Sequence, residues 1–170
     1  MTNLYRRDII AGSTAMIYSK SCEYAIRALA CLAASPGSHP VQGRVIARAE
    51  GISAPVLRKV LHLLTRKRLL RARRGPGGGF CLARRPALVS LMDVVAAVDG
   101  LEHLRQCAVG LARCSDDAPC PLHHTWKGMR EQILQYLETT SLSEMARALA
   151  RKKQLLGRKG RHGIKQTEAY

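Results

Sequence analysis

The chain has 170 residues, 28 lysines and arginines, 12 aspartates and glutamates, and a formal net charge of +16, so a polyanionic partner is expected, with nucleic acid favoured over a membrane surface. This length allows one compact domain with extensions, and a hydrophobic content of 46% suffices for its core. Aromatic residues amount to only 4%, which argues against a single-strand binder built on stacked rings, and no apolar run is long enough to span a bilayer.

Residues 1–15 are predicted to form a disordered leader. The pair Arg6 and Arg7 is typical of one class of export signal, but the stretch that follows is too short and too weakly apolar to complete it. With no export signal, the six cysteines are expected in the reducing cytoplasm. There, spaced cysteines favour metal or redox chemistry over disulfide bonds.

Residues 16–85 are predicted to form a winged helix-turn-helix domain. Apolar residues at helical spacing predict a helix over 19–34, and a shorter helix over 41–50 is closed by Gly51. Ser53 caps a third helix that continues to about Arg68. Two helices across a glycine-containing turn are typical of a helix-turn-helix.

The third helix carries the predicted DNA-reading face. Between residues 44 and 85 there are twelve basic residues and a single acid, Glu50, which favours nucleic acid as the partner of this segment. The alternative is an ordinary solvated polar face. The residues expected to contact DNA from this helix are Ser53, Arg58, Lys59, His62 and Arg66.

Two short strands around Gly75-Pro76-Gly77-Gly78-Gly79 predict a β-hairpin, the wing, with Arg73 and Arg74 as further DNA contacts. A phosphate-binding glycine loop is disfavoured because no Lys-Ser/Thr pair ends it and no helix opens from it. Ser90 and Asp93 form a capping box for a connecting helix within residues 86–100.

A loop over residues 101–124 contains the residues most suited to a cofactor: Cys107, Cys114, Cys120 and His123. The spacing C-x6-C-x5-C lacks the close pairs of most zinc sites and favours three thiolates around an iron–sulfur cluster, with His123 as a possible fourth ligand. Zinc, thiol redox chemistry and no function remain the alternatives. The other cysteines are predicted to be small buried hydrophobic residues: Cys22, Cys31 and Cys81.

Residues 125–156 are predicted to form dimerisation and C-terminal helices. In the first of these helices, successive apolar residues are four and three positions apart, as in a coiled-coil seam of about two heptads. The alternative is a core helix that packs on its own domain. The seam residues are Leu122, Trp126, Met129, Ile133 and Tyr136. Gly157, Gly160 and Gly163 argue against a helix beyond about residue 156, so a basic flexible tail is predicted over residues 157–170.

Three segments together resemble the IscR/NsrR family of winged-helix regulators: residues 16–29, the wing at residues 74–80, and the cysteine loop that ends in Cys120-Pro121-Leu122-His123. They occur in family order between Met16 and Leu149, and the resemblance suggests Met16 as the start of the family's chain. It implies a cytoplasmic, homodimeric transcription factor without enzymatic activity, usually a repressor. Its cluster would sense iron–sulfur status, nitric oxide or redox state.

The resemblance also implies roles for the cluster residues. Cys107, Cys114 and Cys120 match the three cluster cysteines, and His123 matches the histidine ligand of the IscR branch. Glu23 matches the first-helix carboxylate that the nitric-oxide-sensing branch contributes across the dimer. We favour a 2Fe-2S cluster over 4Fe-4S, with His123 over Glu23, because the Cys-x2-His spacing is local.

For DNA, Arg74 matches the wing arginine that enters the minor groove, and Ser53 matches a recognition-helix contact. Pro55, Val56 and Arg58 differ from the residues of IscR, so its operator sequence does not carry over.

We therefore expect a mainly α fold with a small β-wing, in which a winged helix-turn-helix domain is joined to a long dimerisation helix. The expected function is a regulator whose affinity for a double-stranded DNA operator is switched by an iron–sulfur cluster. One alternative is an architectural nucleic-acid-binding protein with a zinc or thiol site. An iron–sulfur redox protein is less favoured, because no second cofactor motif accompanies the cysteines.

Overall fold

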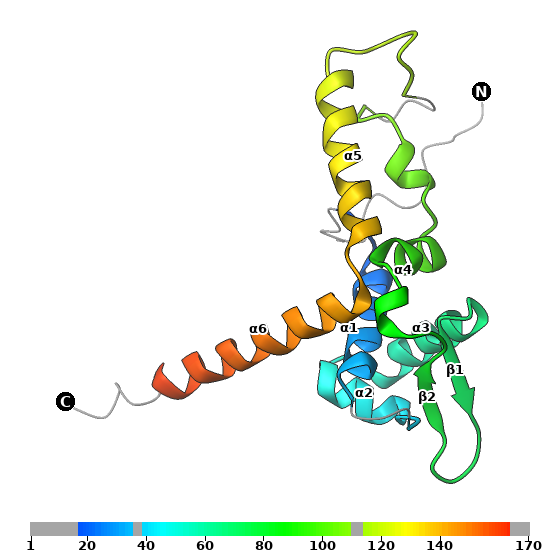
Figure 1. The fold of residues 1–170 in the computed structure, drawn as a ribbon, viewed down its shortest axis with the longest axis vertical. Coiled ribbons are helices and arrows are strands. Elements are labelled where there is room, and N and C mark those ends of the chain that lie inside the picture. Colours follow the sequence, from blue (N-terminus) through cyan, green and yellow to red (C-terminus); the bar gives the residue numbers. More distant parts are fainter. Residues whose placement is uncertain (1–16, 36–38, 110–113, 164–170) are drawn as a thin grey trace, which may run out of the picture.

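The computed structural model describes residues 17–35, 39–109 and 114–163, and it is mainly helical with one small sheet (Figure 1). This confirms the predicted fold class. Short 3-10 turns lie at Pro86–Leu88 and Glu102–Arg105. The longer elements are α1 (Lys20–Ala34), α2 (Gly43–Glu50), α3 (Ala54–Arg66), β1 (Leu70–Arg73), β2 (Gly79–Leu82), α4 (Leu91–Val98), α5 (His123–Thr139) and α6 (Leu142–Gly163).

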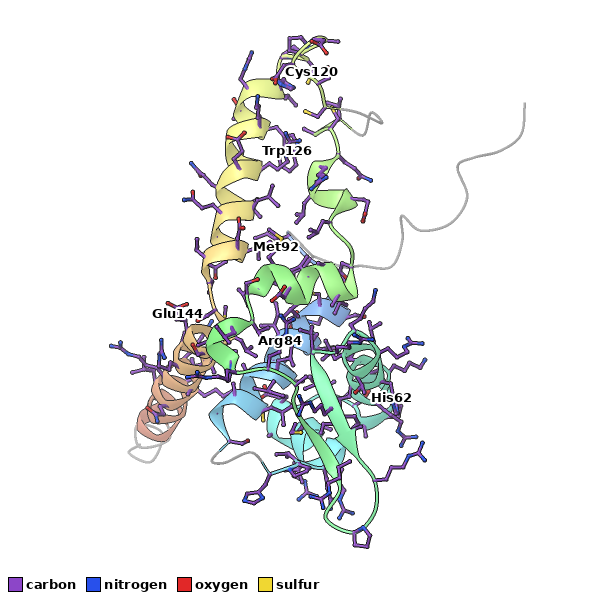
Figure 2. The ribbon with its side chains drawn as sticks, turned by 45° about the vertical axis from the view of Figure 1, so that its right-hand side comes forward. His62, Arg84, Met92, Cys120, Trp126 and Glu144 are labelled. Carbon is purple, nitrogen blue, oxygen red and sulfur yellow. The ribbon has the colours of Figure 1, made fainter. Side chains whose placement is uncertain are left out.

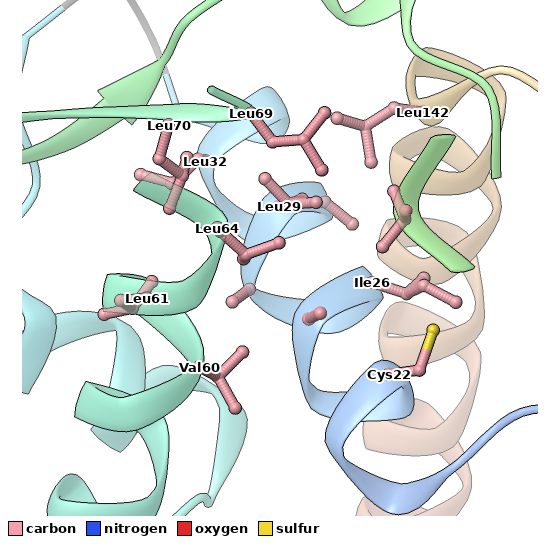
Figure 3. Packing of buried hydrophobic residues seen from close by; sticks show 14 of the residues in the cluster. Cys22, Ile26, Leu29, Leu32, Val60, Leu61, Leu64, Leu69, Leu70 and Leu142 are labelled. Carbon is pink, nitrogen blue, oxygen red and sulfur yellow. The ribbon is translucent and has the colours of Figure 1, made fainter. Parts of the chain in front are cut away.

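Helix α1 is the centre of the fold, because it contacts α2, α3, α4, α6 and β2. Its alanines at positions 25 and 28 are fully buried and let neighbouring helices approach closely, while Leu29 fills the space towards Leu64 of α3 (Figure 3). A fully buried leucine contributes about 1.5–3 kcal/mol through removal of its side chain from water. The Ser19 hydroxyl accepts from the Cys22 N–H and so caps α1.

The helix-turn-helix consists of α2 and α3, joined as the sequence predicts. Gly51 ends α2 in the left-handed conformation, with φ of 61°, where a residue with a Cβ would be strained. Ser53 occupies the N-cap of α3 with extended dihedrals, but its side chain makes no capping hydrogen bond. The hydroxyl of Ser53 is therefore not used by its own helix.

The wing is an antiparallel hairpin in which Leu70 pairs with Leu82 and Arg73 pairs with Gly79. Two hydrogen bonds of 2.9 Å link Val41 and Phe80, so the wing is attached to the segment that leads into α2. A Cβ at Gly79 would lie 2.5 Å from the Val41 backbone, so this attachment requires glycine. The wing and the helix-turn-helix are thus held as one unit.

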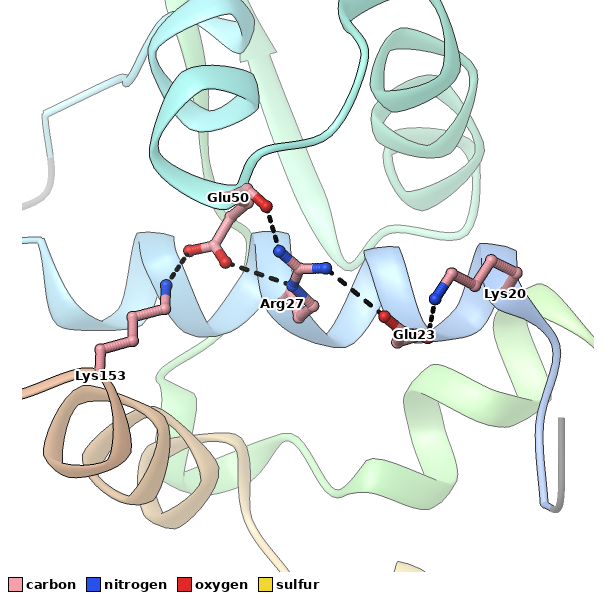
Figure 4. A network of polar contacts seen from close by, with 5 residues as sticks. All are labelled: Lys20, Glu23, Arg27, Glu50 and Lys153. Atoms are coloured by element: carbon pink, nitrogen blue, oxygen red, sulfur yellow. Dashed lines mark hydrogen bonds and ion pairs between the residues drawn. The ribbon is translucent and has the colours of Figure 1, made fainter. Parts of the chain in front are cut away.

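Helix α6 packs along α1 and is joined to it by a buried carboxylate (Figure 4). Glu50, the last residue of α2, has a side chain only 2% exposed, and its oxygens lie 2.6 Å from Lys153 Nζ and 3.4 Å from Arg27 Nε. Arg27 also donates to the Glu50 carbonyl oxygen. Charges from α1 and α6 therefore pair with the one acid of the basic segment.

The sequence prediction for the end of the chain was wrong in one respect. Helix α6 does not stop near residue 156 but continues through Gly157 and Gly160 to Gly163. Each interior glycine costs about 1 kcal/mol relative to alanine, but the residues around them include good helix formers: Leu155, Leu156, Arg158, Lys159 and Arg161. Residues 164–170 and the predicted leader over residues 1–15 lie outside the described residues.

Candidate nucleic-acid interface and metal centre

The polar side of α3 is exposed while its apolar side is buried. Leu57 and Leu61 are 1% exposed and Leu64 is fully buried against α1. His62 lies on the opposite side, and its ring meets the Phe80 ring edge-on at 6.1 Å, so the helix also contacts the wing (Figure 2). The predicted DNA contacts, all exposed, are Ser53, Arg58, Lys59, His62, Arg66, Arg73 and Arg74.

A groove of about 350 Å³ lies between the start of α2, α3 and the wing. Arg44, Arg58 and His62 line it, with Phe80 at its side, and its lining contains no carboxylate. Guanidinium groups in such a groove can bind phosphates or guanine edges, both of which accept hydrogen bonds. The arrangement suits the backbone and major groove of duplex DNA.

The three predicted cluster cysteines precede α5 in the chain, and Figure 2 shows Cys120 near the start of that helix. Cys114 Sγ is 3.2 Å from His123 Nδ1, and the Cys120 carbonyl accepts from the His123 N–H at 2.9 Å. Next to Cys107, the Gln106 carbonyl accepts from Trp126 Nε1 at 2.9 Å. All three cysteines are thus tied, directly or through a neighbour, to the first turns of α5.

Among the described residues of this region, His123 is the most enclosed polar group. It is 3% exposed, and its Nε2 lies 2.7 Å from Asp116 Oδ1. Lys127 Nζ lies 2.8 and 3.0 Å from the two oxygens of Asp116. Hydrogen bonds from Lys127 and then His123 lower the pKa of Asp116 to about 2. No motif flagged Asp116 or Lys127, although Lys127 lies one turn after His123 on the same helix face.

The donor chemistry of the loop fits an iron–sulfur cluster, because thiolates with an imidazole are the ligands that such clusters take. Within the described ranges, no three histidine, cysteine or carboxylate residues stand ready to hold a metal ion. The structure pairs Cys114 with His123, and residues 110–113, between Cys107 and Cys114, lie outside the description. The loop therefore presents suitable ligands without a finished coordination sphere.

Glu23, the alternative fourth ligand, is engaged elsewhere. Its carboxylate lies 2.6 Å from Lys20 Nζ and 3.4 Å from Arg27 on the same helix (Figure 4). The hydrogen bond from Lys20, followed by its charge and by Arg27, lowers the pKa of Glu23. A role as a ligand would require these ion pairs to open.

The remaining cysteines divide into two groups. Cys22 is fully buried as predicted, and its burial, followed by the charge of Asp99, raises the pKa of its thiol to about 12. Cys31 and Cys81 were predicted to be buried but are only half-buried, Cys31 with its side chain packed against the core. Cys81 belongs to the short wing, and a two-stranded hairpin covers only part of each side chain.

Helix α5 projects away from the winged domain, and only its end matches the alternative of a core helix (Figure 1). Its end packs on its own domain, because Leu137 is fully buried and Ile133 contacts the core. Leu134 also packs against the core, and Trp126 is half-buried. Three apolar side chains remain open: Leu122, just before the helix, is 52% exposed, Met129 55% and Tyr136 50%. These three residues recur every seventh position and form an uncovered stripe, which we call the α5 stripe.

Comparisons with known proteins agree with this architecture. Residues 18–148 match the Rrf2 family model, described as an iron-dependent transcriptional regulator. A putative HTH-type transcriptional regulator of Aquifex aeolicus is 31% identical, with 76% of this chain and 91% of that protein covered. The HTH-type transcriptional regulator IscR of Xenorhabdus nematophila is 30% identical, with coverages of 73% and 75%.

Solved structures share the fold. The structure of CymR, the global cysteine regulator of B. subtilis, has a TM-score of 0.68 at 21% identity and covers 78% of this chain and 98% of its own. T. potens IscR has a TM-score of 0.64 at 23% identity, with coverages of 81% and 91%. Among the described residues, no helix has both the length and the apolar character needed to cross a bilayer. The chain belongs to the Rrf2 family of DNA-binding transcriptional regulators, which are not enzymes.

Proposed function

We propose that the protein is a homodimeric repressor whose operator affinity depends on an iron–sulfur cluster held by Cys107, Cys114, Cys120 and His123. The observation that carries this proposal is the attachment of all three cysteines to the first turns of α5. The same helix carries the α5 stripe, the surface on which two copies would meet. A group bound by the loop would therefore act at the dimer seam.

The helix and the wing of the DNA-binding surface have different parts in this function. Helix α3 would enter the major groove, where Arg58 and Lys59 contact bases or phosphates, while Arg74 of the wing reaches the minor groove. When bound, the cluster would cross-link the loop to α5 and so fix how the two reading heads are spaced. A difference of about 3 kcal/mol between the two states changes operator affinity about a hundredfold. Operator DNA as the partner implies a cytoplasmic location.

The test is the absorption spectrum of protein purified without oxygen, together with its iron, sulfide and zinc content. We expect visible absorption with iron and sulfide in equal amounts, and a spectrum of the 2Fe-2S type. Colourless protein that contains zinc would support the architectural alternative, and colourless metal-free protein would support thiol chemistry. Either result would overturn the cluster proposal while leaving the family assignment in place.

Replacement of Arg74 by alanine tests the wing. We expect operator affinity to fall by about 1–3 kcal/mol, because one guanidinium contact in the minor groove is lost. Binding is measured by titration of an operator selected from random duplexes. Arg105→Ala is the matched control, because Arg105 is an exposed arginine beside α5 rather than on the wing. Equal losses for both variants would mean that the wing contributes only general positive charge.

A further inference from the structure

Two residues of the cysteine loop region have contacts that the proposed function does not use. Asp116 lies between Cys114 and Cys120 in the sequence, and Lys127 lies on α5. The Asp116 carboxylate bridges the two parts: one oxygen is 2.7 Å from His123 Nε2, and both oxygens are within 3.0 Å of Lys127 Nζ. The side chain of Asp116 is 66% exposed, so these contacts are what hold it in place.

The contacts determine where the imidazole carries its hydrogen. A lysine ammonium can only donate hydrogen bonds, so the Asp116 carboxylate accepts from Lys127 through both of its oxygens. The Nε2 atom that faces this carboxylate must therefore be the N–H of the ring. In the neutral imidazole the lone pair is then on Nδ1, the atom that lies 3.2 Å from Cys114 Sγ.

The helix fixes this arrangement. His123 and Lys127 are one turn apart on α5, so their side chains project from the same face. His123 is 3% exposed, so its ring cannot rotate freely. Lys127 holds the Asp116 carboxylate, which lies against Nε2 of His123. The lone pair of Nδ1 is thereby directed at the cysteine side of the loop.

We propose that Asp116, held by Lys127, is a positioning residue that makes Nδ1 of His123 the atom that completes the cluster's coordination. This inference rests on the proposed function, because it requires His123 to be a ligand. Carboxylates behind a ligating histidine fix its tautomer and raise its basicity, and their loss typically weakens metal binding about 10–100-fold. The pair Asp116 and Lys127 would accordingly set how long the cluster survives and how readily it is reduced.

The test compares Asp116→Ala, Asp116→Glu and Lys127→Met with the parent protein. Asp117→Asn is the matched control: Asp117 is the next residue, and the change removes the same charge. Among the described residues, its carboxylate accepts a hydrogen bond only from the Ser115 hydroxyl. All proteins are purified without oxygen, and the decay of their visible absorption is followed in excess chelator. The reduction potential of the cluster is measured by titration with dithionite.

We expect Asp116→Ala to assemble a cluster that decays about 10–100-fold faster. Its reduction potential should rise, because a less basic imidazole donates less electron density to iron. Lys127→Met should move both quantities in the same direction by less, Asp116→Glu should restore them in part, and Asp117→Asn should match the parent. Nitrogen-15 labelling of histidine, with pulsed electron paramagnetic resonance of the reduced cluster, should detect one coordinated imidazole nitrogen in the parent.

Two outcomes would overturn the inference while leaving a regulator switched by a cluster on the three cysteines in place. In the first, the cluster of Asp116→Ala has the same lifetime and reduction potential as that of Asp117→Asn, so the Asp116 carboxylate does not act on a ligand. In the second, the parent cluster shows no histidine nitrogen coupling, so His123 is not the fourth ligand. A parent protein that purifies without any cluster would overturn the proposed function itself, and the inference with it.

Discussion

Replacing Met129 by aspartate is expected to give a monomer with little affinity for the operator. Met129 is the central residue of the α5 stripe and is 55% exposed in the single chain, so the change leaves the folded domain intact. In a dimer, two aspartates would face each other across an apolar seam, where unpaired charge is strongly unfavourable. Loss of the second reading head should weaken operator binding by about 10²–10⁴-fold.

Sedimentation velocity and operator titration measure this effect. Gln135→Asp is the matched control, because Gln135 is exposed on α5 but lies about 120° around the helix from Met129, outside the α5 stripe. Ile133→Asp is less suitable, since Ile133 also packs against the chain's own core and its loss would confuse unfolding with dissociation. A Met129→Asp protein that sediments as a dimer would show that the α5 stripe is not the seam.

The helix-turn-helix and the wing could be predicted from the sequence because their signals are local. The apolar spacing of α3, the left-handed glycine at position 51 and the glycine turn of the wing each act within a few residues. Glu50 could not be predicted in this way. Its burial depends on Arg27 and on Lys153, which is 103 residues away in the sequence, and no local pattern contains that pairing.

The sequence suggests candidate ligands for the metal centre, but it does not suggest the contacts that surround them. The spacing of Cys107, Cys114 and Cys120 favours a cluster and makes them its candidate ligands, with zinc and thiol chemistry as the alternatives. The contact between Asp116 and Lys127 spans 11 residues and joins a loop to a helix, so it becomes visible only once α5 has an orientation. The prediction that α6 ends near residue 156 was wrong for a different reason. It rested on the three glycines alone, although their neighbours are good helix formers.

Removal of any one cluster cysteine is expected to abolish the visible absorption and the cluster-dependent part of operator affinity. Cys107, Cys114 and Cys120 would each supply a thiolate, and iron that loses one of three strong ligands is readily released. The alanine variants are compared by absorption, iron content and operator titration. Cys22→Ala is the control, because Cys22 is fully buried among apolar residues and its raised pKa keeps it a neutral thiol. A Cys114→Ala protein with a normal spectrum would remove that residue from the ligand set.

The same measurements decide between His123 and Glu23 as the fourth ligand. His123 already lies 3.2 Å from a cluster cysteine, whereas Glu23 would have to leave Lys20 and Arg27. We therefore expect His123→Ala to give a labile cluster with an altered spectrum and Glu23→Gln to give a normal one. Because Glu23 belongs to α1, the centre of the DNA-binding fold, the reverse result would couple the cluster directly to the reading head rather than through α5. It would also transfer the fourth ligand to the partner subunit, as the resemblance to the nitric-oxide-sensing branch implies.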